Sequence, residues 1–201
     1  MLEAKFLQYM QTLYQQFSAH DAAQSQRLAR YRNIEPESAL FLNMQVRMLQ
    51  AQHILEIGTS TGYSTLWLAN AAQSQNGKVV TVEIDAARIA QAKQYAAALK
   101  LDEYIEFHHQ DALQYLQALN IKFDFILLDA ERDAYINYWP FLSQALVTQG
   151  SVLIVDNVLS HADEVRAFIA LLQADSRFIT SILNIGAGLL LVTPNQAAIT
   201  N

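Results

Sequence analysis

The sequence predicts an α/β protein built on a doubly wound, mostly parallel sheet, and three observations support this prediction. After residue 52, short apolar segments alternate with helical patterns, as in proteins whose parallel strands are joined by helices. The apolar runs at 125–128 and 152–155 suit strands that are buried on both faces. A glycine-bearing loop follows the first strand, where sheets of this kind bind ligands. The 201 residues fit a single domain over 1–201, with N-terminal helices over 1–50 and an α/β core over 51–195.

Helical patterns precede the first strand. Apolar residues at spacings of three and four predict an amphipathic helix over 2–18. A second, short helix is predicted over 21–31, with Asp21 as its N-cap. Pro36 suits the first turn of a third helix, which runs to about Gln50. The apolar stripe of these helices needs a cover, which either the domain itself or a second copy could provide, and we expect a homodimer.

Seven strands complete the predicted sheet, and they are expected at 53–57, 78–83, 104–108, 123–128, 151–155, 178–183 and 189–193. Helices are expected between them, at 62–73, 86–99, 111–119, 134–147 and 162–174. The last two strands flank the glycine-rich turn at 186–188. Two strands around such a turn predict a C-terminal hairpin, which adds an antiparallel strand to the sheet.

The composition excludes several classes of function. The net charge of −6 argues weakly against non-specific nucleic-acid binding, which depends on Lys and Arg meeting phosphates. The chain has no Cys, which excludes disulfides, thiolate catalysis and Cys-ligated metals. No apolar run approaches the roughly 18 residues of a membrane span, and the N-terminus lacks a signal-peptide profile. We therefore expect a cytoplasmic protein without a membrane partner.

The glycine loop distinguishes between nucleotide-like cofactors. It reads Gly58-x-x-x-Gly62 with Ser60 between, and lacks the G-x-G-x-x-G pattern that holds a pyrophosphate. Glu56, at the end of the preceding strand, would repel a pyrophosphate but suits a cofactor that carries an amino group. S-adenosylmethionine (SAM) has an amino group, a sulfonium charge and no phosphate. The loop therefore favours SAM over NAD, and a glycine turn in an unrelated α/β protein is the alternative.

Other strand ends supply candidate cofactor contacts. Glu83 could accept hydrogen bonds from a ribose diol; its alternative role is to cap a helix, which Asp85 could fill. Asp111 could accept from an adenine amino group or cap the following helix. Ser64 could meet the methionine carboxylate at a helix N-terminus, or simply pack there. The complete set of predicted cofactor-binding residues is Glu56, Gly58, Ser60, Gly62, Tyr63, Ser64, Glu83, Asp111, Ala112 and Asp129.

Two carboxylates and an amide follow the fourth and fifth strands. Asp129, Asp156 and Asn157 offer the oxygen ligands that Mg²⁺ or Ca²⁺ prefers. In the alternative interpretation, Asp156 and Asn157 form a turn and Asp129 caps a helix. His161 follows closely enough in sequence that it could reach this site.

Most of the chain resembles a known family. The segments LEIGTSTGYSTLWLA (55–69), VVTVEID (79–85), QDAL (110–113), FDFILLDAERDAYINYW (123–139), GSVLIVDNVL (150–159) and IGAGLLLV (185–192) carry the resemblance. They resemble the metal-dependent catechol- and caffeoyl-CoA-type O-methyltransferases of the class I SAM fold. The resemblance implies that Asp129, Asp156 and Asn157 bind Mg²⁺ or another divalent ion, such as Mn²⁺. It also implies transfer of the SAM methyl group to one of two vicinal hydroxyls, with Asp129 and the residue at position 132 as catalytic groups.

The chain departs from the family at that catalytic position. The family usually has Asp-Ala-Asp-Lys where this chain has Asp129-Ala130-Glu131-Arg132, and the lysine is credited with deprotonating the substrate. Arginine is a poor general base because it stays charged. Either the metal acidifies the hydroxyl sufficiently, or Glu131 or His161 takes the proton, or Arg132 only anchors an anionic substrate. Ser60 replaces a usual glycine, which is tolerable if its backbone angles are ordinary.

The leading hypothesis is a SAM-dependent O-methyltransferase that acts on a catechol-like or other vicinal-diol small molecule. The first alternative is methylation of a hydroxylated wobble uridine (5-hydroxyuridine) in tRNA, which some relatives perform. That alternative would need a basic patch, for which Arg27, Arg30, Arg32 and Arg47 are candidates. The second alternative is a SAM-binding protein with little or no transferase activity.

Overall fold

The fold is built on one seven-stranded sheet with the order β3-β2-β1-β4-β5-β7-β6. The structure is a computed structural model that describes residues 3–146 and 150–195. The strands are β1 (His53–Ile57), β2 (Lys78–Glu83), β3 (Ile105–His109), β4 (Phe125–Leu128), β5 (Val152–Val155), β6 (Phe178–Leu183) and β7 (Leu189–Pro194). Strands β1 to β5 pair in parallel, and β7 pairs antiparallel with both β5 and β6. The predicted doubly wound sheet and its C-terminal hairpin are confirmed.

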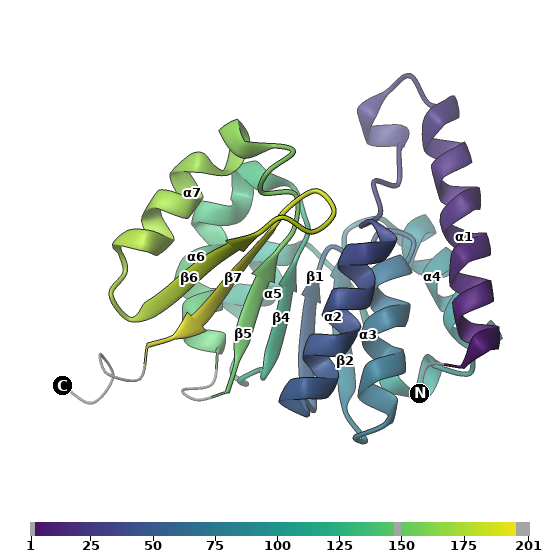
Figure 1. The fold of residues 1–201 in the computed structure, drawn as a ribbon, viewed down its shortest axis with the longest axis horizontal. Coiled ribbons are helices and arrows are strands. Elements are labelled where there is room, and N and C mark those ends of the chain that lie inside the picture. The colour runs from purple at the N-terminus through teal and green to yellow at the C-terminus, as the bar shows by residue number, and fades with distance from the viewer. Residues whose placement is uncertain (1–2, 147–149, 196–201) are drawn as a thin grey trace.

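Helices cover both faces of this sheet (Figure 1). They are α1 (Ala4–Ala23), α2 (Pro36–Leu49), α3 (Tyr63–Gln73), α4 (Ala86–Ala98), α5 (Ala112–Gln117), α6 (Tyr135–Ala145) and α7 (Ala162–Ala174), with 3-10 turns η1 (Arg27–Ala29), η2 (Asp102–Tyr104) and η3 (Arg132–Ala134). Residues of α1 to α4 share one buried core, and residues of α5 to α7 share the other. The two cores explain why β4 and β5 are apolar at every position rather than at alternate ones.

Strand β4 illustrates this double burial. Phe125 and Leu127 belong to the core on the α1–α4 side, whereas Ile126 and Leu128 belong to the other core. Successive side chains of a strand point to opposite faces, so four consecutive apolar residues fill both cores. The strand begins two residues later than predicted, because Phe123 forms only an isolated bridge, with Leu146.

The predicted helix over 21–31 is wrong. Helix α1 continues to Ala23, and only the 3-10 turn η1 follows before α2. Asp21 lies in the last turn of α1 instead of capping a new helix. Its carboxylate accepts hydrogen bonds from the amides of Tyr31 and Arg32, at 2.7 and 2.8 Å. A side chain that satisfies two distant backbone amides holds this segment in place without an α-helix.

The apolar stripe of α1 is covered by the chain itself. The ring of Phe6 meets Trp67 of α3 edge-on at 5.1 Å, and Phe17 packs against Tyr95 of α4 at 5.6 Å. On α2, by contrast, Met44 and Met48 are exposed. The intramolecular cover therefore accounts for α1, and the homodimer stays a prediction. Within the described residues, no helix is both long and apolar enough to cross a membrane.

The carboxyl ends of β1, β4 and β5 meet at one edge of the sheet, the upper edge in Figure 1. Strand β1 lies between β2 and β4, and the strand order runs from it toward β2 and β3 on one side and toward β4 and β5 on the other. A crevice opens at such a switch point, because the connections on its two sides leave in opposite directions. The functional site is expected there.

Candidate functional site

A cavity of about 820 Å³ lies at this edge of the sheet. Its wall includes Gly58 and Ser60 after β1, Glu83 at the end of β2, and Asp111 after β3. Asp129 and Asn157, which follow β4 and β5, line the same cavity. The structure therefore brings the predicted cofactor residues and two of the three predicted metal ligands to one space.

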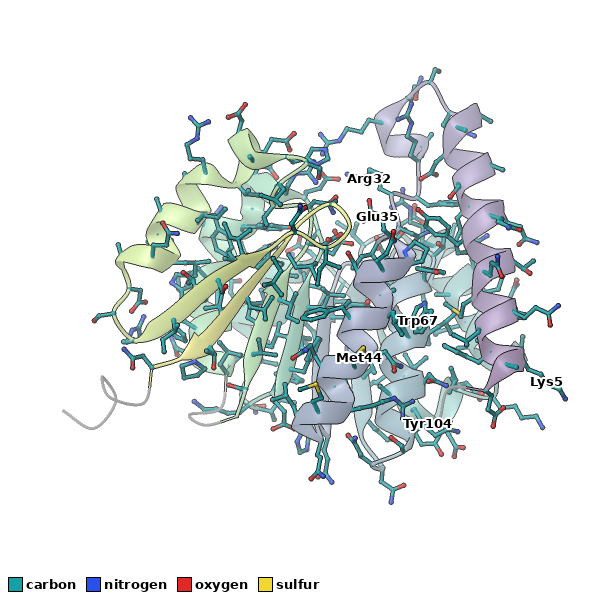
Figure 2. All side chains as sticks on the ribbon, viewed as in Figure 1. Lys5, Arg32, Glu35, Met44, Trp67 and Tyr104 are labelled. Atoms are coloured by element: carbon teal, nitrogen blue, oxygen red, sulfur yellow. The ribbon has the colours of Figure 1, made fainter. Side chains whose placement is uncertain are left out.

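The segment between α1 and α2 supplies another wall, which the sequence analysis missed. Tyr31, Arg32 and Asn33 line the cavity, and Figure 2 shows Arg32 and Glu35 at this edge of the molecule. The side-chain nitrogen Nδ2 of Asn33 donates to the hydroxyl of Thr61 at 2.9 Å, which holds the segment against the glycine loop. The segment carries no motif, so its place could not be predicted from local pattern.

Gly58 permits the close approach between the glycine loop and β4. Its φ is +103°, and a Cβ added there would collide with the carbonyl oxygen of Asp129. Only glycine adopts this backbone conformation without strain and also leaves room for that oxygen. The loop is thus wedged against the residue that begins the predicted metal site.

Ser60 does not have the ordinary backbone angles that its tolerance was expected to require. Its φ is +46°, in the left-handed region that disfavours a residue with a Cβ. Two hydrogen bonds hold it: its amide donates to Oε2 of Glu83 at 2.8 Å, and its hydroxyl donates to the carbonyl of Tyr31 at 2.8 Å. The serine side chain therefore makes a link to the N-terminal segment that glycine could not make.

Glu83 is nearly saturated by backbone amides. Besides Ser60, the amides of Ile84 and Asp85 donate to its Oε1, each at 3.0 Å. A carboxylate offers about four lone-pair positions, so roughly one remains for a ligand. Asp85 is the N-cap of α4 and accepts from the amides of Ala87 and Arg88. The capping role thus falls to Asp85, and the ribose contact of Glu83 stays a prediction.

Asp111 caps α5, as its alternative interpretation required. Its side chain accepts from the amide of Gln114 at 3.0 Å, while Asp111 and Ala112 both line the cavity. The cap occupies Oδ1, which leaves the other oxygen of this half-buried carboxylate for a ligand. The adenine contact therefore stays a prediction.

Glu56 lies behind the cavity wall and not in it. Its side chain is fully buried, and its oxygens accept from the hydroxyls of Ser64, Thr65 and Thr81 at 2.5 to 2.6 Å. Glu56 is therefore not exposed to the cavity, although it holds the hydroxyl of the lining residue Ser64, and its contact with a cofactor amino group stays a prediction. The other two predicted contacts outside the cavity lining are Gly62 and Tyr63; Tyr63 is buried against Tyr14 and Phe17.

The buried carboxyl of Glu56 is expected to make stability fall as pH rises. Burial raises its pKa from 4.5 to about 7, although the three hydroxyl donors oppose that shift. A folded-state pKa above the unfolded value favours folding most below pH 4.5, and the advantage is lost as pH rises through 7. The loss amounts to about 3 kcal/mol. Urea unfolding of wild type and Glu56→Gln at pH 5 and pH 8 would measure it.

The variant should remove this part of the pH dependence, because an amide does not ionise. Glu103→Gln, at an exposed glutamate of η2, is the matched control and should leave the wild-type dependence in place. Equal pH dependence in wild type and Glu56→Gln would contradict the assignment.

Asp129, Asp156 and Asn157 form a buried cluster at the ends of β4 and β5. The Nδ2 of Asn157 donates to Oδ1 of Asp129 at 3.2 Å and to Oδ2 of Asp156 at 2.9 Å. Burial raises the pKa of Asp129 to about 6; burial and then the charge of Asp129 raise the pKa of Asp156 to about 9. Two carboxylates this close disfavour each other's ionisation unless a cation accompanies them.

The cluster fits a hard divalent cation. Oδ1 of Asp156 is buried and has no hydrogen-bond partner, which is costly for a carboxylate oxygen unless a ligand meets it. Across residues 3–146 and 150–195, no three His, Cys, Asp or Glu side chains are grouped closely enough to hold a metal ion, so a site here would include the amide of Asn157. The Asn157 side chain can present its oxygen instead of its nitrogen after a half-turn. Asn157 itself has φ of +65°, a strained backbone of the kind found at functional sites.

Arg132 occupies the end of the cavity beside this cluster. Its side chain is only 5% exposed, and its Nε donates to Oε2 of Glu164 at 2.7 Å. Glu131, next to it, pairs with Arg32 at 2.6 Å and with Arg27 at 3.2 Å. Burial and then the charge of Arg132 lower the pKa of His161, which also lines the cavity. The predicted proximity of His161 to this site is thus found in the structure.

The basic patch required for the tRNA alternative does not form from all four predicted arginines. Arg27, Arg30 and Arg32 line the cavity, whereas Arg47 near the other end of α2 bonds to Asn43, Asn70 and Ser74. Three arginines at a cavity mouth remain, and two of them are paired with Glu131. Methylation of tRNA gains no support from this arrangement.

The sheet order, its reversed β7 and the cavity at the strand ends define a class I SAM-dependent methyltransferase. The model of the O-methyltransferase family matches residues 8–194, so the chain belongs to that family.

Relatives and solved structures agree with this membership. The catechol O-methyltransferase of Niastella koreensis is 30% identical over 131 residues, which are 63% of this chain and 58% of that protein. The catechol O-methyltransferase of Mycobacterium tuberculosis is 32% identical over 143 residues, 71% of this chain and 62% of that protein. The matches thus span less than two thirds of these two relatives. The O-methyltransferase of Bacillus cereus, solved in complex with S-adenosylhomocysteine, has a TM-score of 0.79 at 25% identity, covering 97% and 93% of the two chains.

Proposed function

We propose that the protein transfers the methyl group of SAM to one hydroxyl of a catechol-like or other vicinal-diol small molecule, with assistance from a divalent metal. One observation supports this most directly: a single cavity joins Glu83 and the glycine loop to Asp129 and Asn157, with the unpaired oxygen of Asp156 behind them. The similarity to two catechol O-methyltransferases points to the same class of acceptor.

In this proposal SAM lies across the ends of β1, β2 and β3. Glu83 accepts a ribose hydroxyl with its remaining lone pair, and Asp111 and Ala112 face the adenine. Ser60 and Ser64 face the methionine portion, next to the N-terminus of α3, whose dipole favours a carboxylate. Asp129 lines the same cavity and would lie beside the cofactor as well as at the metal site.

Asp129, Asp156 and Asn157 would hold Mg²⁺, or Mn²⁺ or Ca²⁺ in its place. When bound, such an ion supplies Lewis acidity to the two acceptor oxygens. The walls of the cavity hold the acceptor and the cofactor in one orientation, which contributes proximity to the reaction.

The reaction forms one bond and breaks another. The acceptor oxygen bonds to the methyl carbon while the carbon–sulfur bond breaks, and its electron pair returns to sulfur. The products are a methyl ether and S-adenosylhomocysteine, and the hydroxyl proton must leave. Arg132 cannot take it, because a guanidinium has no acceptor site. His161 is our candidate, because its lowered pKa keeps the imidazole neutral near pH 7.

Methyl transfer from labelled SAM to catechol tests the proposal. With Mg²⁺ present we expect turnover, and with a chelator in excess we expect none. Turnover that survives chelation would contradict the metal assignment but would still support the proposed methyl transfer. No turnover in either condition, with SAM binding confirmed by calorimetry, would favour a SAM-binding protein with little activity.

A further inference from the structure

The guanidinium of Arg132 is a buried charge that the protein satisfies only in part. Its Nε donates to Glu164, but neither terminal nitrogen has a hydrogen-bond partner among the described residues. Arg132 lines the cavity, so these donors can meet a molecule that binds there. A charged group that is 95% removed from solvent is costly unless its donors are used. The open donors therefore point to a ligand.

The neighbouring charges favour an anion there. Arg27 and Arg32 line the same end of the cavity, and with Arg132 they place three guanidinium groups against the carboxylates of Glu131 and Glu164. Those carboxylates are nearly half exposed, so they neutralise the arginines only weakly. The negative charges of Asp129 and Asp156 would be balanced by a divalent cation bound between them, and not by the arginines. Glu131 and Glu164 balance two of the three guanidinium groups, so one positive charge is left among these five residues. The carboxylate of Glu35 belongs to the acidic cluster instead, because, after burial, its charge helps to raise the pKa of Asp129 and of Asp156.

We propose that the acceptor carries a carboxylate and that Arg132 binds it through its two terminal nitrogens, so that the substrate is a carboxylated catechol. The inference rests on the proposed transferase function and deepens it. A guanidinium matches a carboxylate with two parallel hydrogen bonds, a geometry that lysine cannot offer. The arginine at this position thus determines specificity rather than removing a proton.

The test compares acids with neutral acceptors of the same shape. We expect kcat/KM for 2,3- or 3,4-dihydroxybenzoate to exceed that for the corresponding amide by at least about tenfold, as for a hydrogen-bonded charge pair. Arg132→Met should bring this ratio close to one, and Arg132→Lys should restore it in part. Arg166→Met is the matched control: Arg166 is exposed on α7, pairs with Asp163 and lies outside the cavity. It should keep the wild-type ratio.

A binding experiment separates failure of this inference from failure of the transferase proposal. Calorimetry with benzoate and benzamide on the protein saturated with S-adenosylhomocysteine needs no turnover. Benzoate should bind more tightly than benzamide, and Arg132→Met should abolish the difference while thermal unfolding confirms that the variant is folded. Equal binding of the acid and the amide, or equal turnover of both, would overturn the carboxylate site. Absence of turnover with every catechol, despite selective benzoate binding, would instead overturn the proposed reaction.

Discussion

Asp156→Ala is expected to lower methyl transfer by more than ~100-fold, because outer-shell changes at metal sites already cost 10–100-fold and Asp156 is assigned as a ligand. SAM affinity should stay within about twofold, since distant sites contribute independently. The fold should survive the change. Burial and the charge of Asp129 raise the pKa of Asp156 to about 9, so removing this carboxyl also removes a repulsion from the metal-free protein.

Three measurements on this variant distinguish the outcomes: turnover with Mg²⁺, SAM binding by calorimetry, and Mn²⁺ binding by electron paramagnetic resonance. Asp133→Ala, at an exposed aspartate of η3 outside the cavity lining, is the matched control and should behave as wild type. An equal loss of SAM binding and of activity in Asp156→Ala would show that the metal and the cofactor do not occupy separate strand ends.

Glu83→Gln is expected to weaken SAM binding by about 10- to 100-fold, the effect of losing hydrogen bonds to a charged group. The carboxylate accepts three backbone amides, from Ser60, Ile84 and Asp85. An amide side chain must turn its NH₂ group toward at least one of these donors, which displaces the loop as well as removing the ribose contact. Calorimetry with SAM and S-adenosylhomocysteine should show equal losses, because both carry the same ribose.

The metal site should be unaffected by this change, so Mn²⁺ binding should match the wild type. Glu106→Gln, at an exposed carboxylate of β3, controls for the change in net charge. Wild-type SAM affinity in Glu83→Gln would contradict the ribose contact. Glu83 would then have only a structural role, in holding the glycine loop.

The fold was largely predictable because its signals are local or periodic. Alternating apolar and helical segments were sufficient to predict the sheet, and a glycine-rich turn was sufficient for the hairpin. The helix expected over 21–31 failed because Asp21 uses its carboxylate on amides ten and eleven residues away. Local capping statistics do not contain such a tertiary contact.

The candidate site was predictable where a residue type and a strand end coincide. Glu83, Asp111 and Asp129 reach the cavity for that reason. Glu56 lies one residue before the end of β1, yet its carboxylate faces the hydroxyls of Ser64, Thr65 and Thr81 inside the protein. The sequence does not specify how deeply a strand residue is buried. Tyr31 and Asn33 line the cavity because they form hydrogen bonds with Ser60 and Thr61, which are about 28 residues away in the sequence. No local sequence pattern encodes such contacts.

Gly58 connects the two halves of the site mechanically. A side chain at this position would push on the carbonyl of Asp129, so one substitution would shift the glycine loop and a proposed metal ligand together. In a library of all single substitutions, position 58 should therefore tolerate no replacement, while positions 60 and 132 tolerate some. A substitution at position 58 thus cannot alter one half of the site without the other.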